Sequence, residues 1–298
     1  MTTRNTLLGF VALAVAAVLA GCGVAAASPH TAATGWTGTG DIRWMINSGA
    51  IDLINGNTGN ATLTTNAFDD NRTNETGTVA PNWQSLPTTT YPSYTAFSAA
   101  VTQLAAGSWV IYDNESWTFT PSREQQDPGT YMAKFVALAH QHQIHVILTP
   151  AVDITTKMSC HVTSDPSWQN YLTNCHLPTL AGDAHPDAFE IQSQGYQDDT
   201  DATSTQCGCY AWFTRQAASQ ARAVAGEQAL SVYSGLSTNH SGVVSTGANL
   251  HTDSVDTRQA VDGYWLNVPR QGKYCPGCTK SGNPEVAVAY LRMLGYSG

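Results

Sequence analysis

The sequence predicts a (β/α)8-type, TIM-like barrel. Strand-like and helix-like segments alternate along most of the chain, and this order is typical of parallel βα units. The 298 residues are enough for one large domain with a full hydrophobic core. Neither Gly-x-Gly-x-x-Gly after the first strand nor Gly-x-x-x-x-Gly-Lys occurs, which disfavours the alternative fold, an open doubly wound parallel sheet.

Short apolar runs and helix-capping residues place the individual elements. The expected strands are 42–46, 109–112, 145–148, 188–192, 230–234 and 263–268. Helices are expected after Ser93 and after Asp127, because both residue types cap helix N-termini well. Two more are expected over 210–224 and after Asn283, which precedes a proline. The Asn/Thr/Gly-rich stretch 55–92 is predicted to be a long loop, so a complete barrel needs two strands that the pattern does not reveal.

The N-terminal segment is typical of an exported protein. Arg4 precedes an apolar run, 7–20, that is too short to span a bilayer comfortably. The run closes on Leu-Ala-Gly-Cys at 19–22, which resembles a bacterial lipobox. We therefore expect a signal peptide at 1–21, a lipid anchor on Cys22, a flexible tether over 22–40 and one domain over 41–298. The alternative is cleavage after Ala25-Ala26-Ala27, which would give a fully secreted protein.

The remaining cysteines are expected to form disulfides, because their number is even and the predicted compartment is oxidising. These residues are Cys160, Cys175, Cys207, Cys209, Cys275 and Cys278. The first two enclose a short polar loop and make the most natural pair. The other four allow several connectivities: a bond between Cys207 and Cys209 would be strained, and cross-pairing of these two with Cys275 and Cys278 is one of the remaining arrangements. Zinc binding by these four, or a redox role for Cys275-Pro276-Gly277-Cys278, is the alternative.

Composition excludes some partners and favours others. Charged residues make up only 12% of the chain, the net charge is −9 and no Lys/Arg cluster occurs, so nucleic acid is not an expected partner. Eight Trp and twelve Tyr on a weakly charged chain favour carbohydrate, because aromatic faces pack on pyranose rings. His140, His142 and His145 straddle a helix end and a strand start, so we expect no metal site there. No motif indicates a cofactor.

The ends of the predicted strands carry the candidate functional residues, because barrel enzymes place their chemistry at the carboxyl ends of the strands. Asp113 and Glu115 follow the strand 109–112 and point the same way, since side chains of an extended segment alternate. The residues expected around one cleft are Asp113, Glu115, Trp117, Asp153, Glu190, Gln192, Asn239, Trp265 and Asn267.

Paired carboxylates are the groups that glycoside cleavage needs. Glu115 is the expected general acid, because Asp113 would raise its pKa by like-charge repulsion while Trp117 limits solvent. Glu190 is the expected nucleophile or base. Asp153, Gln192, Asn239, Trp265 and Asn267, with Trp117, would bind the sugar. The alternative is that Asp113 and Glu115 only cap the turn after the strand.

Several motifs carry a family resemblance that spans most of 105–296. They are Tyr112-Asp113-Asn114-Glu115-Ser116-Trp117, Glu124-Gln125-Gln126-Asp127-Pro128, Phe189-Glu190-Ile191-Gln192-Ser193-Gln194, Gly235-Leu236-Ser237-Thr238-Asn239 and Gly263-Tyr264-Trp265-Leu266-Asn267-Val268-Pro269. Together they resemble uncharacterised secreted actinobacterial proteins with a glycoside-hydrolase-like barrel. Asp113 and Glu115 also match the Asp-x-Glu end of the family 18 chitinase motif, although 109–112 lacks the preceding Asp-Gly-x-Asp. The resemblance implies the barrel fold. The export signal and the paired carboxylates predict a cell-envelope glycoside hydrolase, and the alternative is a barrel that only binds carbohydrate or another envelope component.

Overall fold

The computed structural model describes residues 42–69, 73–77, 85–197, 209–226, 229–240, 242–272 and 275–298, all within one compact unit. The predicted signal peptide, the lipidation site Cys22, the tether and Cys207 lie outside the described residues.

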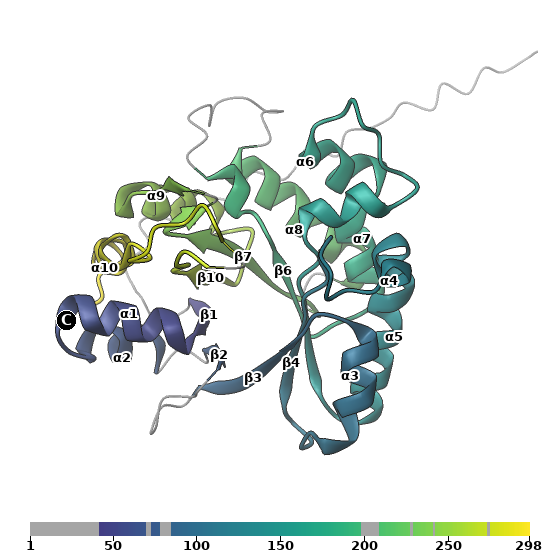
Figure 1. The fold of residues 1–298 in the computed structure, drawn as a ribbon, viewed down its shortest axis with the longest axis horizontal. Coiled ribbons are helices and arrows are strands. Elements are labelled where there is room, and N and C mark those ends of the chain that lie inside the picture. The colour runs from purple at the N-terminus through teal and green to yellow at the C-terminus, as the bar shows by residue number, and fades with distance from the viewer. Residues whose placement is uncertain are drawn as a thin grey trace, which may run out of the picture. The chain divides into compact units, whose positions relative to one another are not determined.

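Eight parallel strands close into a barrel, which confirms the predicted fold class (Figure 1). Around the barrel the strands run in the order β1-β10-β7-β6-β5-β4-β3-β2, and β2 pairs with β1 to complete the circle. Their bounds are β1 Arg43–Asn47, β2 Asn74–Thr76, β3 Leu86–Tyr91, β4 Trp109–Tyr112, β5 His145–Leu148, β6 Ala188–Ile191, β7 Ser231–Ser237 and β10 Gly263–Asn267. A separate antiparallel pair, β8 (Asn239–His240) and β9 (Val243–Val244), follows β7.

Helices follow most of the strands and surround the barrel (Figure 1). The α-helices are α1 Ser48–Thr58, α2 Thr62–Phe68, α3 Tyr94–Ala100, α4 Ser122–Gln126, α5 Pro128–Gln141, α6 Ser167–Gln169, α7 Leu177–Asp183, α8 Tyr210–Ala225, α9 Gly247–Thr257 and α10 Pro284–Met293. Shorter turns are η1 Val101–Gln103, η2 Val152–Lys157, η3 Asn170–Asn174 and η4 Gln194–Tyr196. The predicted caps are confirmed: Ser93 Oγ accepts from Ala96 N at 3.0 Å, and Asp127 Oδ1 accepts from Thr130 N at 3.3 Å.

The prediction of a long loop over 55–92 is wrong. That stretch contains the end of α1, all of α2 and the two strands that were missing, β2 and β3. In α2, Leu63, Ala67 and Phe68 are completely buried, so three apolar side chains anchor a helix that is otherwise polar. β3 reads Leu-Pro-Thr-Thr-Thr-Tyr and pairs on both sides, because β-branched Thr suits a strand even without an apolar pattern.

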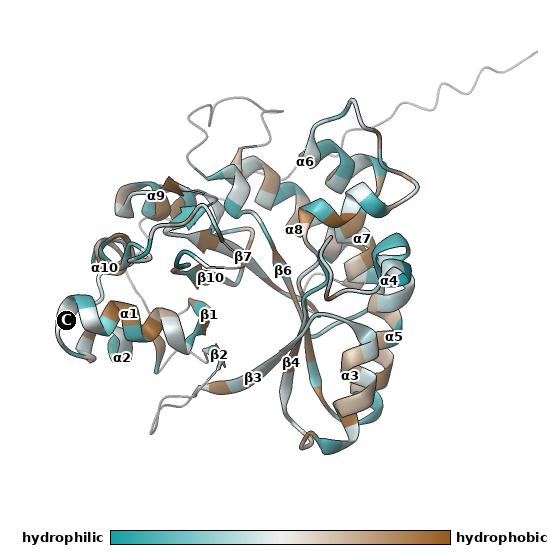
Figure 2. Cartoon of the chain, viewed as in Figure 1, coloured by the Kyte–Doolittle hydropathy of each residue, from teal (hydrophilic) through white to brown (hydrophobic). Residues whose placement is uncertain are grey.

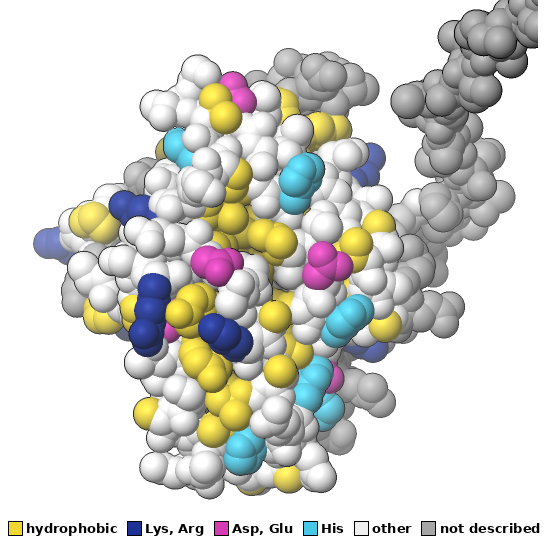
Figure 3. Space-filling model, turned by 90° about the vertical axis from the view of Figure 1, so that its right-hand side faces the viewer, with side chains coloured by type: hydrophobic (Ala, Val, Ile, Leu, Met, Phe, Trp, Pro, Cys, Tyr) yellow, Lys and Arg dark blue, Asp and Glu magenta, His cyan; other side chains and the backbone are white. Residues whose placement is uncertain are grey.

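Apolar side chains form an inner core within the barrel and an outer layer beneath the helices. The inner core is Met45, Ile111, Ile147, Ala188 and Tyr233. The outer layer takes the alternate residues of the same strands, and the helices show both apolar and polar segments in Figure 2. On the face drawn in Figure 3, charged side chains are few and scattered among uncharged surface. No helix in the described ranges is both long and apolar enough to cross a membrane.

The cysteines confirm disulfide bonding and exclude one of the possible pairings. Cys160 is bonded to Cys175, as expected, with their Cα atoms 5.2 Å apart. Cys275 is bonded to Cys278, so the cross-pairing of these two with Cys207 and Cys209, one of the arrangements left open by the sequence, does not form. A turn closed by Cys278 N and Cys275 O at 3.2 Å brings their side chains together. Cys209 is also disulfide-bonded.

Candidate active site

Two carboxyls, Asp113 and Glu115, sit where β4 ends and are hydrogen-bonded to each other. Two ionised carboxylates this close repel each other, so the contact favours a state in which one of the pair holds a proton. Asp113 is 8% exposed and Glu115 is more open to solvent. The pair therefore behaves as one proton-holding unit at the carboxyl end of the barrel.

Neighbouring strands fix the deeper member of the pair. Asp113 Oδ1 accepts from Thr149 Oγ1 at 3.2 Å, at the end of β5, and from Gln192 Nε2 at 3.1 Å, at the end of β6. Gln192 Nε2 also donates to the Thr149 carbonyl at 3.0 Å, and its side chain hydrogen-bonds Glu115. Because an amide N–H can only donate, Gln192 favours the ionised form of the carboxyl it contacts.

The site raises the pKa of both carboxyls above the usual range. Burial is the main cause for each; for Glu115 the charges of Asp113 and Asp153 add to it. Hydrogen bonds from Thr149 and Gln192 oppose the rise at Asp113. Glu115 is thus the member of the pair that keeps a proton most readily and that solvent can reach, as a general acid requires.

Glu190 lies below the pair and does not line the cavity. On β6 it shares a face with Ala188 of the inner core and with Gln192 above it, because side chains alternate along a strand. The residue is 0% exposed, and neither carboxyl oxygen has a hydrogen-bond partner in the part of the chain that the structure describes. Burial, followed by the charges of Asp113 and Glu115, raises its pKa well above the usual value.

Asp153 also lies close to the pair but has a different set of contacts. It belongs to η2, and its Oδ1 accepts from Ser116 N at 3.1 Å, which ties the loop after β5 to the loop after β4. Burial raises its pKa, although the hydrogen bond from Ser116 and the charge of Lys157 oppose this. Asp153 is absent from the cavity lining, so it positions the loop that carries Glu115.

A cavity of about 980 Å³ opens above the pair at the carboxyl ends of the strands. It is lined by Thr90, Pro92, Asp113, Glu115, Trp117, Thr118, Phe119, Gln192, Gln194, Ser237, Asn239, His240, Trp265, Asn267, Pro269, Arg270, Gly272 and Cys275. The structure thus brings seven of the nine predicted site residues to one cavity and leaves out Asp153 and Glu190. Its volume is at the upper end of the range for small-molecule sites.

The loop that carries Trp117 is held by hydrogen bonds within the loop and to its surroundings. Trp117 Nε1 donates to Thr120 Oγ1 at 2.7 Å, and Gln125 Nε2 donates to the carbonyls of Trp117 and Thr120 at 2.6 and 2.7 Å. Glu124, from the same predicted motif, accepts from Tyr94 N at 2.7 Å at the start of α3 and from Tyr112 Oη at 3.0 Å. These motif residues hold the wall of the cavity in place.

The opposite wall comes from β7 and β10. Trp265 and Asn267 are two apart on β10 and both line the cavity, as their shared face predicts. Asn239 follows β7, is 1% exposed and accepts from Gly242 N at 2.9 Å through Oδ1. Its Nδ2 has no hydrogen-bond partner among the described residues. Indole and amide groups thus face the carboxyl pair across the cavity.

Sequence reasoning did not single out several lining residues. Arg270 is the only Lys or Arg in the described lining, and it lies three residues after the predicted Asn267. Following the chain past the end of that strand would have found it. Phe119 comes from the loop after β4, and His240 from the two-residue strand β8, whose course no sequence pattern indicates. Burial lowers the pKa of His240.

Two of the three clustered histidines, His140 and His145, contact the same carboxylate. His140 Nε2 lies 3.1 Å from Asp187 Oδ2, and His145 Nδ1 lies 2.8 Å from Asp187 Oδ1. Val146 N also donates to Asp187 at 2.9 Å. This cluster is at the amino end of β5 and β6, so it belongs to the other end of the barrel. Within the described ranges, no group of three or more His, Cys, Asp or Glu side chains could hold a metal ion.

No family model matches the sequence, and no curated protein matches it. Among solved structures, a thiamine phosphate pyrophosphorylase from Pyrococcus furiosus aligns with 86% of this chain and 98% of its own, at 10% identity and a TM-score of 0.24. A sugar phosphate isomerase/epimerase from Parabacteroides distasonis aligns with 90% of this chain and 97% of its own, at 8% identity and a TM-score of 0.33. At these values neither alignment carries an argument about activity. The barrel implied by the actinobacterial resemblance is confirmed by the strand pairing, whereas no sequence comparison supports that resemblance or the likeness to chitinases.

Proposed function

We propose that this protein is a glycoside hydrolase that cleaves a carbohydrate chain in the large cavity, with Glu115 as the general acid. The observation that carries the proposal is the hydrogen-bonded pair of Asp113 and Glu115, which forms part of the lining of a cavity that also holds indole and amide side chains. A carboxyl that stays protonated near neutral pH is what protonation of a leaving glycosidic oxygen requires.

The pair supplies both halves of a proton cycle. Glu115 gives its proton to the departing sugar oxygen, which leaves two carboxylates side by side in a poorly solvated site. Their repulsion then raises the proton affinity of the pair, so Glu115 takes a proton back from the water that completes hydrolysis. Asp113 stays in place because Thr149 and Gln192 hold its Oδ1.

The pair does not by itself supply both groups that usually flank a glycosidic bond. In retaining and inverting enzymes those carboxyls are about 5 Å or more apart, whereas Asp113 and Glu115 are hydrogen-bonded to each other. Two sources remain for the second group: Glu190, which reaches a substrate only if the cavity floor opens, or an amide on the sugar itself. If the wild-type protein cleaves sugars without a 2-acetamido group and Glu190→Gln does not, the second catalytic group is Glu190.

The test is a screen for released reducing sugar with wild type and Glu115→Gln across polysaccharides with and without 2-acetamido groups. We expect the wild-type protein to cleave at least one polysaccharide that Glu115→Gln does not cleave. If wild type cleaves none of them, but Trp265→Ala weakens binding to one, the barrel is a carbohydrate-binding protein. Asp113 would then have a structural role, joining the end of β4 to the ends of β5 and β6 through its hydrogen bonds with Thr149 and Gln192.

We further propose that the protein works outside the cytoplasm, tethered through a lipid on Cys22. The support is the lipobox-like sequence together with the disulfides Cys160–Cys175 and Cys275–Cys278, since such bonds persist in oxidising compartments. Cys22→Ala should move the protein from the membrane fraction to the medium or block its maturation. A wild-type protein that is soluble and begins at Ser28 would instead be fully secreted.

A further inference from the structure

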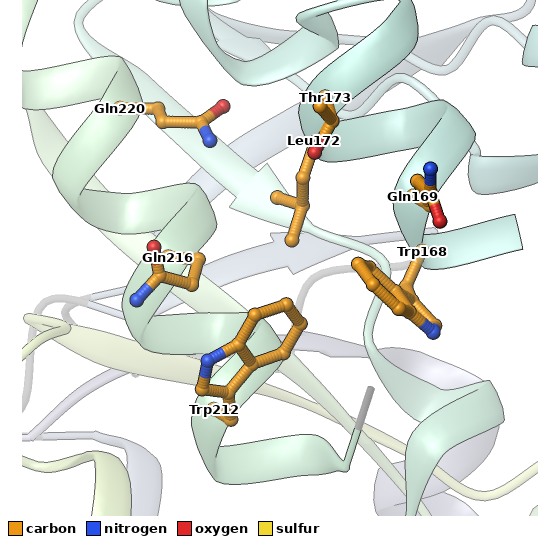
Figure 4. Close-up of a pocket in the computed structure, with 7 residues that line it drawn as sticks. All are labelled: Trp168, Gln169, Leu172, Thr173, Trp212, Gln216 and Gln220. Carbon is orange, nitrogen blue, oxygen red and sulfur yellow. The ribbon is translucent and has the colours of Figure 1, made fainter. Parts of the chain in front are cut away.

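A second pocket lies outside the barrel, between α8 and the segment formed by α6 and η3. It has a volume of about 340 Å³ and is lined by Trp168, Gln169, Leu172, Thr173, Trp212, Gln216 and Gln220. Figure 4 shows the residues of α8 facing those of α6 and η3 across the open space. The volume is at the low end of the range for small-molecule sites, which suits one small unit such as a single sugar ring. None of these residues lines the large cavity.

One wall of this pocket is a polar stripe along α8. Trp212, Gln216 and Gln220 are spaced by four residues and therefore lie on one side of the helix. The adjacent stripe, which includes Phe213 and Ala217, is buried against the barrel. A helix already anchored by its apolar face thus presents an indole and two amides to the pocket.

The other wall is held rigid by bonds within the excursion after β5. The Cys160–Cys175 disulfide closes the segment that carries Trp168 and Leu172. Inside it, the buried Asn170 accepts from Val162 N at 2.7 Å and donates to Val162 O at 3.0 Å. A wall fixed in this way loses little conformational entropy when a ligand binds.

The chemistry of the lining selects the class of ligand. Trp168 and Trp212 meet edge to face, with ring centroids 5.1 Å apart, so a face of at least one indole can take an apolar ring surface. Gln220 Oε1 is buried and has no hydrogen-bond partner within the described ranges, and a buried acceptor of this kind is costly unless a donor reaches it. No lining residue carries a charge. Hydroxyl donors on a neutral ring match all three features.

We propose that this pocket is a second carbohydrate-binding site that takes one neutral sugar residue of a polysaccharide. An indole packs on the ring, and the amides of Gln216 and Gln220 hydrogen-bond its hydroxyls. The site acts on its own and does not depend on hydrolysis in the large cavity. On a polymer it would hold the protein near cleavable bonds and so raise their effective concentration at the cleft.

The test is native electrophoresis in gels containing xylan, laminarin, glucomannan or hydroxyethylcellulose as neutral polysaccharides, or alginate as the acidic one. All proteins carry Glu115→Gln, so that no polysaccharide is consumed. The parent protein carries this substitution alone. We expect at least one neutral polysaccharide, and not alginate, to retard its migration. Trp212→Ala and the double variant Gln216→Ala/Gln220→Ala should weaken the apparent Kd at least about tenfold. The same loss should occur when they are combined with Trp265→Ala, which removes the indole of the large cavity from the comparison.

The matched control is Gln141→Ala, which removes an exposed glutamine at the end of α5, far along the chain from the pocket. This control should migrate like the parent protein. Thermal melting should show that the double variant Gln216→Ala/Gln220→Ala is folded, since Gln216 is exposed. Four results would overturn the second site. The pocket variants could be retarded as strongly as the protein without them, or Trp265→Ala alone could abolish the retardation. Retardation could also occur only in alginate, or be absent from every gel. None of these results bears on release of reducing sugar by the wild-type protein, which tests the proposed hydrolase separately.

Discussion

The two ends of the barrel hold their carboxylates in opposite ways. At the amino end, Asp187 precedes β6 and accepts from His140, His145 and the backbone of Val146. Although burial opposes ionisation, these hydrogen bonds lower the pKa of Asp187.

The same pattern recurs at β10, where Asp262 Oδ2 accepts from Arg222 at 2.7 Å and from Val232 N at 2.8 Å. At the carboxyl end, by contrast, Asp113, Glu115 and Glu190 have one another as neighbours, and none forms an ion pair within the described part of the chain.

This difference separates a structural role from a chemical one. A carboxylate that accepts hydrogen bonds from side-chain and backbone donors stabilises the fold, whereas buried carboxyls gathered together lower stability and hold protons that chemistry can use. Replacing acidic residues should therefore have opposite effects on folding at the two ends.

The largest expected effect concerns Glu115→Gln. The variant keeps the shape and hydrogen-bonding reach of the side chain but cannot donate an acidic proton, so turnover of any cleaved polysaccharide should fall at least about a hundredfold. Its melting temperature should not fall, because one of the clustered carboxyls is removed. Turnover within a few-fold of wild type would take the acid role away from Glu115.

A smaller effect, of opposite direction on folding, is expected for Asp187→Ala. The change removes the acceptor for His140, His145 and Val146 N, and should cost about 1–3 kcal/mol of unfolding free energy at pH 7. Because the pKa of Asp187 is lowered in the folded state, its contribution is present above the usual Asp range and is lost as the pH falls through the folded-state value. Urea unfolding at pH 7 and pH 3 should therefore show a smaller difference from wild type at pH 3.

Glu190→Gln should stabilise the protein at neutral pH by roughly 1 kcal/mol, or about 2–4 °C in Tm. The folded state binds the Glu190 proton more tightly than the unfolded chain does, so this residue makes stability fall as the pH rises above about 4, the ordinary Glu range. The gain should accordingly be large at pH 8 and small at pH 4. If Glu190→Gln and the wild-type protein differ in Tm by the same amount at pH 8 and pH 4, the pKa of Glu190 lies in its ordinary range.

The smallest expected effect is a shift in the pH profile of Asp113→Asn. The charge of Asp113 helps to raise the pKa of Glu115, so its removal should let Glu115 ionise at lower pH. The alkaline limb of kcat should then move down by about one pH unit, a change that a purely structural role for Asp113 would not produce. An unmoved limb would remove Asp113 from the proton-holding pair.

Strong local patterns made most of the barrel predictable. β5 was expected at 145–148 and occupies His145–Leu148, because a run of apolar residues between a helix end and a proline has few other folds. β2 and β3 were missed because Thr and Asn carry no hydrophobic period, and only pairing with neighbouring strands makes them strands. Local sequence contains no information about such long-range pairing.

The site was predictable to the extent that strand ends determine it. Trp265, Asn267 and Gln192 line the cavity because barrel geometry brings all the carboxyl ends together. Glu190 was placed with them although it lies one step deeper on its strand, since alternation gives the face of a residue but not its depth. The second pocket escaped notice because its walls are two helices whose contact depends on tertiary packing.

Closure of the barrel through β1 and β10 also constrains when the chain can fold. Met45 pairs with Trp265, and Trp44 Nε1 donates to Tyr296 Oη at 3.3 Å, so one of the two edges of the first strand finds its partner only near the end of the chain. Contacts so distant in sequence form late, and the circle of strands stays open until nearly all of the polypeptide has left the ribosome. Until β10 emerges, one edge of β1 therefore stays without its final partner, and an unpaired strand edge of this kind is a place where a second chain could pair.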